Sequence, residues 1–305
     1  MNQKIFINTL NFNNSDITLK FLNSLRELNK NGLKLYVIIV DNSTKAKINI
    51  KEDDFKDLNL KIIDPMENTG FAAGNNIAIK RSLKESADYI LIINNDVILD
   101  KDLLLELLKN AESDEKTGVV VPKIYFAKGY EFHKDRYKEG ELGHVFWYAG
   151  GEIDWKNMIV SHRGVDEVDK GQFEKQIETN FATGCCMLVK AEVFKKIGMF
   201  DEKYFLYFED ADLSQRVKKA GYKIVYTPKA ILWHENAGST GGSGSNLQDY
   251  FISRNRMLFG FKYAPLRTKL ALIKESLLIL SKGRPSQKKG VRDFYLGRLG
   301  KGSYK

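Results

Sequence analysis

The sequence has few cysteines and no long apolar run, and both absences narrow the kinds of protein it can be. Its two cysteines, Cys185 and Cys186, are neighbours in a chain of 305 residues, so a structural disulfide between them is not expected. CxxC spacing and Cys/His pairs at zinc-finger spacing do not occur. No run approaches the ~20 apolar residues of a membrane span, and the first residues do not resemble a signal peptide. We therefore expect a cytoplasmic protein.

Negative charge is scarce at one end of the chain. Residues 262–305 hold 12 Lys and Arg against 2 Asp and Glu, which accounts for the net charge of +9, because residues 1–261 have a net charge of −1. A nearly neutral main part argues against a nucleic-acid-binding face. The basic C-terminal tail instead predicts contact with an acidic surface.

What the sequence does contain is an alternation of apolar strands with amphipathic helices. In the first half, strands are predicted at residues 4–10, 35–40, 60–63, 89–93 and 119–124, and the helices between them include residues 72–83. After an irregular polar and aromatic stretch with a hairpin, residues 125–178, the prediction is a strand at 181–189, a helix at 209–220 and a strand at 223–226 before Pro228. Strands without a polar face predict a parallel, doubly wound α/β sheet.

Polar side chains follow three of these strands where each strand ends. The three groups are Thr9–Asn13, Asp41–Ser43 and Asn94–Asp96. Each alone fits an ordinary turn, but in a parallel sheet these ends converge at the edge where ligands bind. The string NTGFAAGNN, residues 68–76, adds glycines that would let the backbone approach a diphosphate or a base closely, and the helix N-terminus that follows favours anions. The string is neither GxGxxG nor a Walker loop. Together they predict a nucleotide pocket.

Seven strings occur in a fixed order over most of residues 1–245. They are TLNFNN, VDNS, NTGFAAGNN, IINNDV, ATGCCMLVKAEVFKKIGMFDEKYFLYFEDADLSQR, GYKIVYTPKAILWHE and STGGS. This ordered set resembles family 2 glycosyltransferases of the GT-A fold, of the bacterial rhamnosyltransferase-like kind that builds cell-surface polysaccharide. The resemblance implies a Rossmann-like, mostly parallel sheet with flanking helices. It also implies inverting transfer of a sugar, with rhamnose as one candidate, from a UDP- or dTDP-linked donor to a saccharide acceptor that is commonly lipid-linked.

The resemblance also implies roles for residues of a donor-binding half, residues 1–124. Asp41 matches the acidic residue that recognises the base of the donor, and Asn94 to Asp96 match the DxD motif with Asn94 in place of the first acid. Asp96 is then expected to bind a divalent ion directly and Asn94 to contact the ribose. His234 matches a second ligand of that ion, which is Mg²⁺ or Mn²⁺, with the imidazole favouring Mn²⁺. The other expected donor contacts are Thr9, Asn11, Asn68, Gly74 and Asn75.

An acceptor-side half, residues 125–261, is expected to supply the base. In the string FEDADLSQR the resemblance assigns the general base to Asp210, with Glu209 as the runner-up. Acids at a helix N-terminus also stabilise the helix without any catalytic role, and Asp212 is expected to pair with Arg216 four residues later. Gly184 is expected to let substrate lie against the backbone. Residues 1–261 would thus form one GT-A domain.

The tail, residues 262–305, contains a leucine-rich stripe with basic residues beside it. Helical spacing places Leu266, Leu270, Ile273, Leu277 and Leu280 on one face, flanked by Lys269 and Lys274. Two interpretations remain open: the helix packs on the catalytic domain, or it lies on an anionic membrane at its cytoplasmic face.

Two other functions compete with glycosyl transfer. A sugar-nucleotide pyrophosphorylase would need a glycine-rich, basic loop directly after the first strand, and TLNFNN is not such a loop. A catalytically inactive nucleotide-sugar-binding module agrees with the substitution at Asn94, but Asp96, Asp210 and His234 together argue against it.

Overall fold

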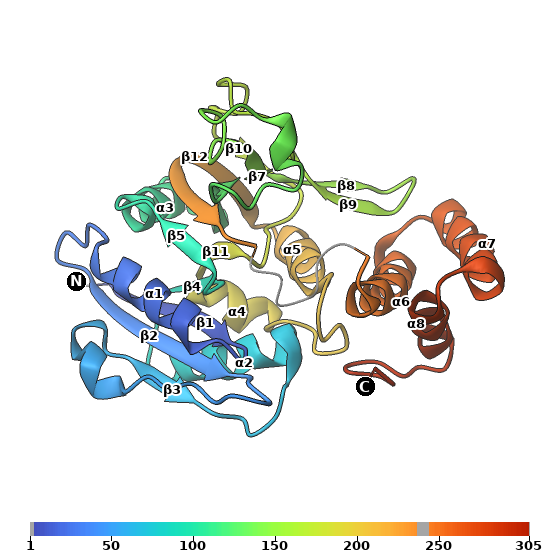
Figure 1. Cartoon of the computed structure of the whole chain (residues 1–305), viewed down its shortest axis with the longest axis horizontal. Helices are drawn as coiled ribbons and strands as arrows, with labels where there is room; N and C mark the ends of the chain where they lie inside the picture. The colour runs from blue at the N-terminus through green and yellow to red at the C-terminus, as the bar shows by residue number, and fades with distance from the viewer. Residues whose placement is uncertain (1–2, 237–243, 305) are drawn as a thin grey trace.

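A mixed sheet forms the centre of the structure, a computed structural model that describes residues 3–236 and 244–304 (Figure 1). Four parallel strands form one side in the order β3-β2-β1-β4: β1 (Lys4–Asn11), β2 (Lys34–Asp41), β3 (Lys61–Ile63) and β4 (Tyr89–Ile93). Next to β4 lies β11 (Cys186–Lys190), which is antiparallel to both β4 and β6 (Thr117–Phe126). Beyond β6, and parallel to it, lies β12 (Lys223–His234). The predicted α/β architecture with a mostly parallel sheet is confirmed.

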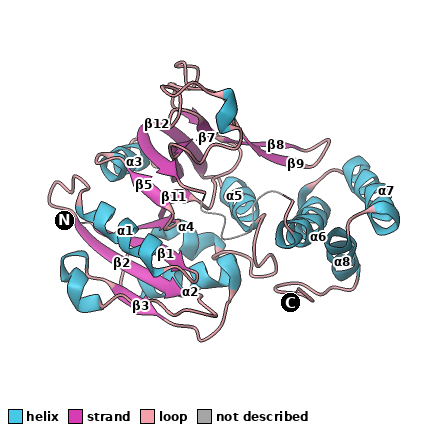
Figure 2. Ribbon diagram, in the orientation of Figure 1, coloured by secondary structure: helices cyan, strands magenta, loops and turns pink. Residues whose placement is uncertain are grey.

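Helices flank this sheet, as Figure 2 shows. They are α1 (Ser15–Arg26), α2 (Gly70–Lys84), α3 (Leu103–Glu112), α4 (Ala191–Ile197) and α5 (Glu209–Lys219), with 3₁₀ turns at Glu52–Leu58 and Lys134–Arg136. All five residues of β4 are buried, as an apolar strand with both faces covered requires. α2 packs on β1 and β2, whereas α3 packs on β6 and β12.

The polar and aromatic stretch at residues 125–178 forms short strands at the other side of the sheet. β7 (Phe146–Tyr148) pairs with β6, and β10 (Ile177–Glu178) pairs with β12. The predicted hairpin is formed by β8 (Gly151–Asp154) and β9 (Ile159–His162), which reaches toward the C-terminal helices in Figure 1.

Two strands differ from their predicted extents, and both differences affect the candidate site. β12 does not end before Pro228 but continues to His234, because a register shift between Thr227 and Ile231 places the proline where its missing N–H breaks no regular ladder. The added length pairs His234 with Val97 of β5 (Val97–Leu99). In contrast, the strand predicted at 181–189 begins only at Cys186, which leaves Gly184 in a loop.

The C-terminal helices pack on one another beside the sheet (Figure 1). They are α6 (Asn246–Tyr263), α7 (Leu266–Lys282) and α8 (Pro285–Tyr295). α6 crosses the boundary expected between residues 261 and 262 and packs on the main body, with Phe259 stacked on Trp155 and Phe251 on Phe205. None of the helices in the described residues is both long and apolar enough to cross a lipid bilayer. The motif STGGS, residues 239–243, lies outside the described residues.

Candidate functional site

The ends of β1 and β2 meet through a buried polar network. Asn11 and Asp41 are opposite each other in the register, and Asn11 Nδ2 donates to Asp41 Oδ1 at 2.8 Å and to Ser43 Oγ at 2.9 Å. Asp41 Oδ2 accepts from the Ile48 N–H at 2.9 Å. Burial opposes ionisation, but hydrogen bonds from Ile48, Ser43 and Asn11 hold the pKa of Asp41 below its ordinary value. Asp41 is therefore a fixed anionic acceptor, and its oxygens have further lone pairs for a donor base.

A hydrogen-bonded threonine extends this network to the end of β4. Thr18 Oγ1 donates to Asn11 Oδ1 at 2.7 Å and accepts from Asn95 Nδ2 at 2.7 Å. The predicted convergence of these strand ends is thus borne out. Ser43 belongs to the predicted group Asp41–Ser43, whereas Thr18 was not predicted, since a single hydroxyl on a helix has no distinguishing pattern. Thr9 precedes this rim: it is fully buried, and its Oγ1 has no partner within the described part of the chain.

The segment NTGFAAGNN serves the packing of α2. Asn68 Oδ1 accepts from the Gly70 N–H at 2.9 Å, and Asn75 is buried with its side chain on the Phe71 carbonyl. Gly74 lies so close to the sheet that an added Cβ would be 2.8 Å from Asn42 Nδ2. The donor roles of Asn68, Gly74 and Asn75 remain predictions.

The first N–H groups of α2 are already bonded. Those of Phe71 and Ala72 donate to the Phe205 carbonyl at 2.7 Å and 3.2 Å. Our expectation that this helix N-terminus receives a diphosphate is therefore wrong for these two groups, because a protein carbonyl occupies the place of the anion.

Asp96 and His234, which are far apart in sequence, face each other beside the end of β4. Asp96 Oδ1 lies 3.2 Å from His234 Nε2, and the His234 side chain is almost completely buried. The Trp147 ring packs against the imidazole, with ring centroids 4.7 Å apart. Asn94 lies next to this pair, and its N–H donates to the Cys185 carbonyl at 2.9 Å.

These two side chains offer two potential ligands to a metal ion. Among the described residues, no group of three or more His, Cys, Asp and Glu side chains could hold an ion. His234 Nδ1 is buried and has no hydrogen-bond partner in the described ranges, while Nε2 faces the carboxylate. One carboxylate oxygen and one imidazole nitrogen suit Mn²⁺, and also Mg²⁺ when phosphate oxygens complete the shell. The residues therefore fit an ion that binds together with a diphosphate.

Asp210 bonds to the residue before Cys185, whose carbonyl accepts from the Asn94 N–H. Its Oδ2 accepts from the Gly184 N–H at 3.0 Å and its Oδ1 from the Ala211 N–H at 2.8 Å. Burial raises the pKa of Asp210 above its ordinary value. Gly184 is packed closely here, since an added Cβ would be 2.9 Å from the Phe71 ring. The loop from Gly184 to Cys185 thus brings Asp210 to the rim that carries Asn94 and Asp96.

The neighbouring carboxylate, Glu209, has a different environment. It is only 4% exposed, and its Oε2 has no hydrogen-bond partner in the residues that the structure describes. Burial, and then the charge of Asp210, raise the pKa of Glu209 well above its ordinary value. Glu209 therefore holds a proton more readily than a solvent-exposed glutamate.

Sequence relatives of this chain act in glycan assembly. An N-acetylglucosaminyl-diphospho-decaprenol L-rhamnosyltransferase of Mycobacterium tuberculosis is 36% identical over 118 residues, which cover 36% of this chain and 38% of the relative. A low-salt glycan biosynthesis hexosyltransferase, Agl10, of Haloferax volcanii is 25% identical over 228 residues, which cover 72% of this chain and 66% of the relative. The chain therefore spans less than two thirds of the length of either relative.

Solved structures show the same fold at low identity. A crystal structure of GalNAc-T7 with UDP, GalNAc and Mn²⁺ aligns with a TM-score of 0.62 at 13% identity, covering 93% of this chain and 58% of that one. Residues 1–349 of TarS from S. aureus align with a TM-score of 0.57 at 16% identity, covering 96% and 79%. Both support the GT-A fold. The family model described as Glycosyl transferase family 2 matches residues 7–198, more than half of the sequence, and the chain therefore belongs to that family.

Proposed function

We propose that this protein is an inverting glycosyltransferase that moves a sugar from a UDP- or dTDP-linked donor to a saccharide acceptor. The observation that carries the proposal is the meeting of three groups at one rim: the Asp41–Asn11 network, the Asp96–His234 pair and the half-buried Asp210. The first group suits a nucleoside, the second suits a diphosphate with its ion, and the third can act as the proton acceptor.

Each group has a defined part in the proposed reaction. Asp41 and Asn11 hold the base of the donor, and Asn94 contacts the ribose. Asp96 and His234 would hold a Mn²⁺ or Mg²⁺ ion, which would supply positive charge to offset that of the departing diphosphate. Asp210 takes the proton of the acceptor hydroxyl. The acceptor oxygen attacks the anomeric carbon from the face opposite the diphosphate, which inverts the configuration.

Asp210 is favoured over Glu209 as the base on chemical grounds. A general base must be unprotonated when the acceptor arrives, and Glu209 is the more deeply buried of the two, with the charge of Asp210 further opposing its ionisation. Asp210 also keeps one carboxylate oxygen on the Gly184 N–H, which orients it.

The acceptor is proposed to be a lipid-linked saccharide, with rhamnose as one candidate for the transferred sugar. The name of the M. tuberculosis relative describes transfer of L-rhamnose to a sugar on a diphospho-decaprenol carrier. A chain with a related catalytic half would meet such an acceptor at a membrane surface.

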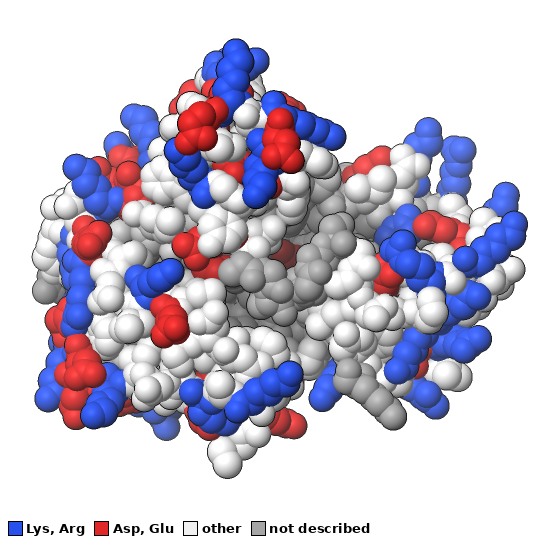
Figure 3. All heavy atoms as spheres, viewed as in Figure 1, with Lys and Arg blue, Asp and Glu red and all other residues white. Residues whose placement is uncertain are grey.

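The exposed face of α7 supports a membrane contact. α7 packs inward through Thr268, Leu272 and Ser276, so the predicted leucine stripe is not its packing face. Leu266, Leu270 and Leu277 are 73%, 59% and 59% exposed. In Figure 3, Lys and Arg side chains gather on the side of the molecule where α7 and α8 lie. We propose that this face rests on an anionic leaflet, since basic amphipathic helices bind such surfaces.

Calorimetry and a transfer assay test the proposed donor site together. UDP or dTDP should bind in the presence of Mn²⁺, and Asp96→Ala or His234→Ala should each weaken that binding by removing one ligand of the ion. Leu19→Gln, on the exposed surface of α1, is a control that should bind like the wild type. Binding and transfer that survive a chelator would contradict the metal role. Ion-dependent binding without transfer to any lipid-linked saccharide would instead indicate an inactive binding module.

A further inference from the structure

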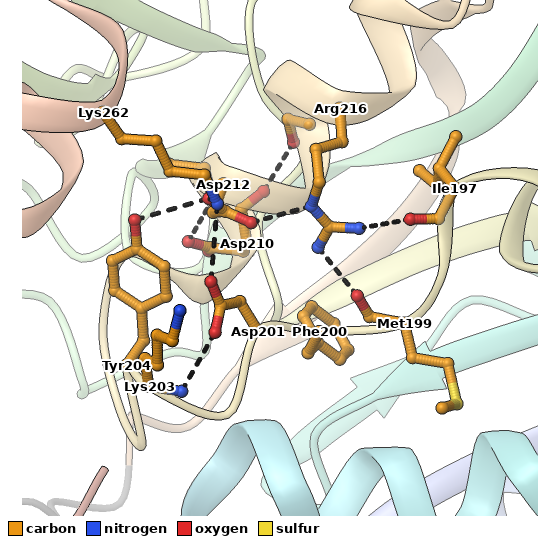
Figure 4. Close-up of polar contacts among 12 residues, drawn as sticks. Ile197, Met199, Phe200, Asp201, Lys203, Tyr204, Asp210, Asp212, Arg216 and Lys262 are labelled. Atoms are coloured by element: carbon orange, nitrogen blue, oxygen red, sulfur yellow. Dashed lines mark hydrogen bonds and ion pairs between the residues drawn. The ribbon is translucent and has the colours of Figure 1, made fainter. Parts of the chain in front are cut away.

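The first turn of α5 is attached to the C-terminal helix α6 through a buried carboxylate (Figure 4). Asp212 is fully buried, and its Oδ2 accepts from Arg216 Nε at 2.8 Å, as predicted from their spacing. Its Oδ1 accepts from Lys262 Nζ at 2.6 Å and from the Tyr263 hydroxyl at 2.9 Å. Lys262 and Tyr263 end α6, so this one side chain joins the two helices.

The other side of α5 is attached to the loop before β11. Ser214 Oγ donates to the Asp210 carbonyl at 2.7 Å and accepts from the Ala182 N–H at 3.0 Å. Asp210 itself bonds to Gly184 in the same loop. α5 therefore lies between this loop and α6, with hydrogen bonds on both sides.

The spacing of the two aspartates connects these attachments. Residues two positions apart on an α-helix point about 200° apart around its axis. Asp212 thus faces α6 while Asp210 faces the loop at Gly184. Any rotation of α5 that follows the loss of the Asp212 contacts must also move the Asp210 carboxylate.

We propose that Lys262 and Tyr263 are positioning residues for sugar transfer: by holding Asp212 they fix the rotation of α5 and hence the place of Asp210 relative to the acceptor hydroxyl. The proposal rests on the base role proposed for Asp210. Lys262 is also the cation that, with Arg216, offsets the buried charge of Asp212. Because the family match ends at residue 198, neither α5 nor α6 belongs to the matched part of the chain.

The test compares turnover with donor binding in variants of the full chain. Lys262→Met should lower kcat about 10²-fold, the loss typical of misplacing a reacting group by about 1 Å, while UDP or dTDP binding with Mn²⁺ stays at the wild-type level. Lys262→Arg keeps the charge and should restore most of kcat. Tyr263→Phe, which removes only a hydroxyl, should lower kcat less and guards against a Lys262→Met protein that fails to fold.

Arg256→Met is the matched control for loss of a tertiary contact on the same helix. Arg256 pairs with Glu275 and donates to the Met158 and Asn157 carbonyls, and none of these polar contacts involves α5. Its loss should lower the melting temperature but leave kcat unchanged when assayed well below that temperature. A folded Lys262→Met protein with wild-type kcat, or an Arg256→Met protein that loses kcat equally, overturns the positioning role. If Asp210→Asn is also fully active, the base assignment fails instead.

Discussion

At the scale of single residues, the adjacent carboxylates Glu209 and Asp210 can be separated by experiment. Asp210→Asn is nearly isosteric, but an amide cannot take a proton from the acceptor. Transfer should therefore fall by roughly 10²- to 10⁴-fold, while donor binding measured by calorimetry survives. Glu209→Gln removes a charge one position away and is the matched control. An inactive Glu209→Gln protein beside a fully active Asp210→Asn protein would move the base to Glu209.

Glu209 should also make stability depend on pH. Its pKa is raised in the folded state, so the folded protein binds this proton more tightly than the unfolded chain does. That contribution to stability is fully present below the ordinary pKa of glutamate and is lost as the pH rises through the folded-state pKa. Melting temperatures of wild type and Glu209→Gln, measured from pH 4 upward, should therefore diverge, with the variant gaining relative stability as pH rises. Parallel curves would show that Glu209 does not titrate in this way.

The sequence predicted which side chains belong to the rim better than it predicted their partners. Asp41 and Asn11 could be placed because parallel strand ends converge, and Asp212 with Arg216 because of helical spacing. The Asp96–His234 pair joins residues 138 positions apart, and only the family resemblance indicated it. The contact from Lys262 to Asp212 gave no sequence signal, because an ordinary lysine at a helix end carries no pattern.

At the scale of elements, the sequence predicted the ends of strands and helices less well than the elements themselves. Pro228 was taken to end a strand, but a register shift accommodates it, and the longer β12 is what brings His234 to Asp96. The N-terminus of α2 was taken for an anion site, but the Phe205 carbonyl fills it. Both outcomes depend on contacts between segments far apart in sequence, which local propensity does not contain.

The leucine face of α7 gives a prediction for this single element. Leu270→Gln and Leu277→Gln should each weaken binding to anionic liposomes about tenfold, if each leucine contributes about 1.5 kcal/mol on insertion. Binding should also decline as salt shortens the Debye length to about 3 Å at 1 M. Sedimentation with liposomes measures both effects, and Leu19→Gln on α1 is the control. Equal sedimentation of all these proteins would mean that this face has another partner or none.

At the scale of the whole molecule, buried hydrogen bonds attach the C-terminal helices to one another and to the loop before α5. Asn255 of α6, fully buried, donates to the carbonyls of Tyr204, Leu206 and Tyr207 in the loop that leads into α5. α8 in turn holds α6, since Asp293 bonds to the Tyr250 hydroxyl and Arg284, at the start of α8, pairs with Asp249. The tail, residues 262–305, was predicted as a helical unit from its charge and spacing, with packing on the main domain left open, because neither property reports on buried contacts of this kind.

Removing residues 262–305 should therefore also disturb the part of the chain that remains, including α5 and α6. The truncation deletes Lys262 and Tyr263, leaves the buried Asp212 with Arg216 as its one cation and the Tyr204 hydroxyl among its partners in the described residues, and exposes the face of α6 that α8 covers. Because Asp212 keeps Arg216, losing Lys262 costs less than the about 3–5 kcal/mol of a buried charge left without any partner, but the loss of the α6–α8 packing adds to it against the roughly 5–15 kcal/mol that stabilises a typical domain. We expect a melting temperature many degrees below that of the full chain, and transfer lost even with a water-soluble acceptor that needs no membrane. Circular dichroism and a soluble-acceptor assay measure the two effects. A truncated protein that melts and turns over like the full chain would establish residues 1–261 as an independent domain and leave α7 and α8 with a role at the membrane alone.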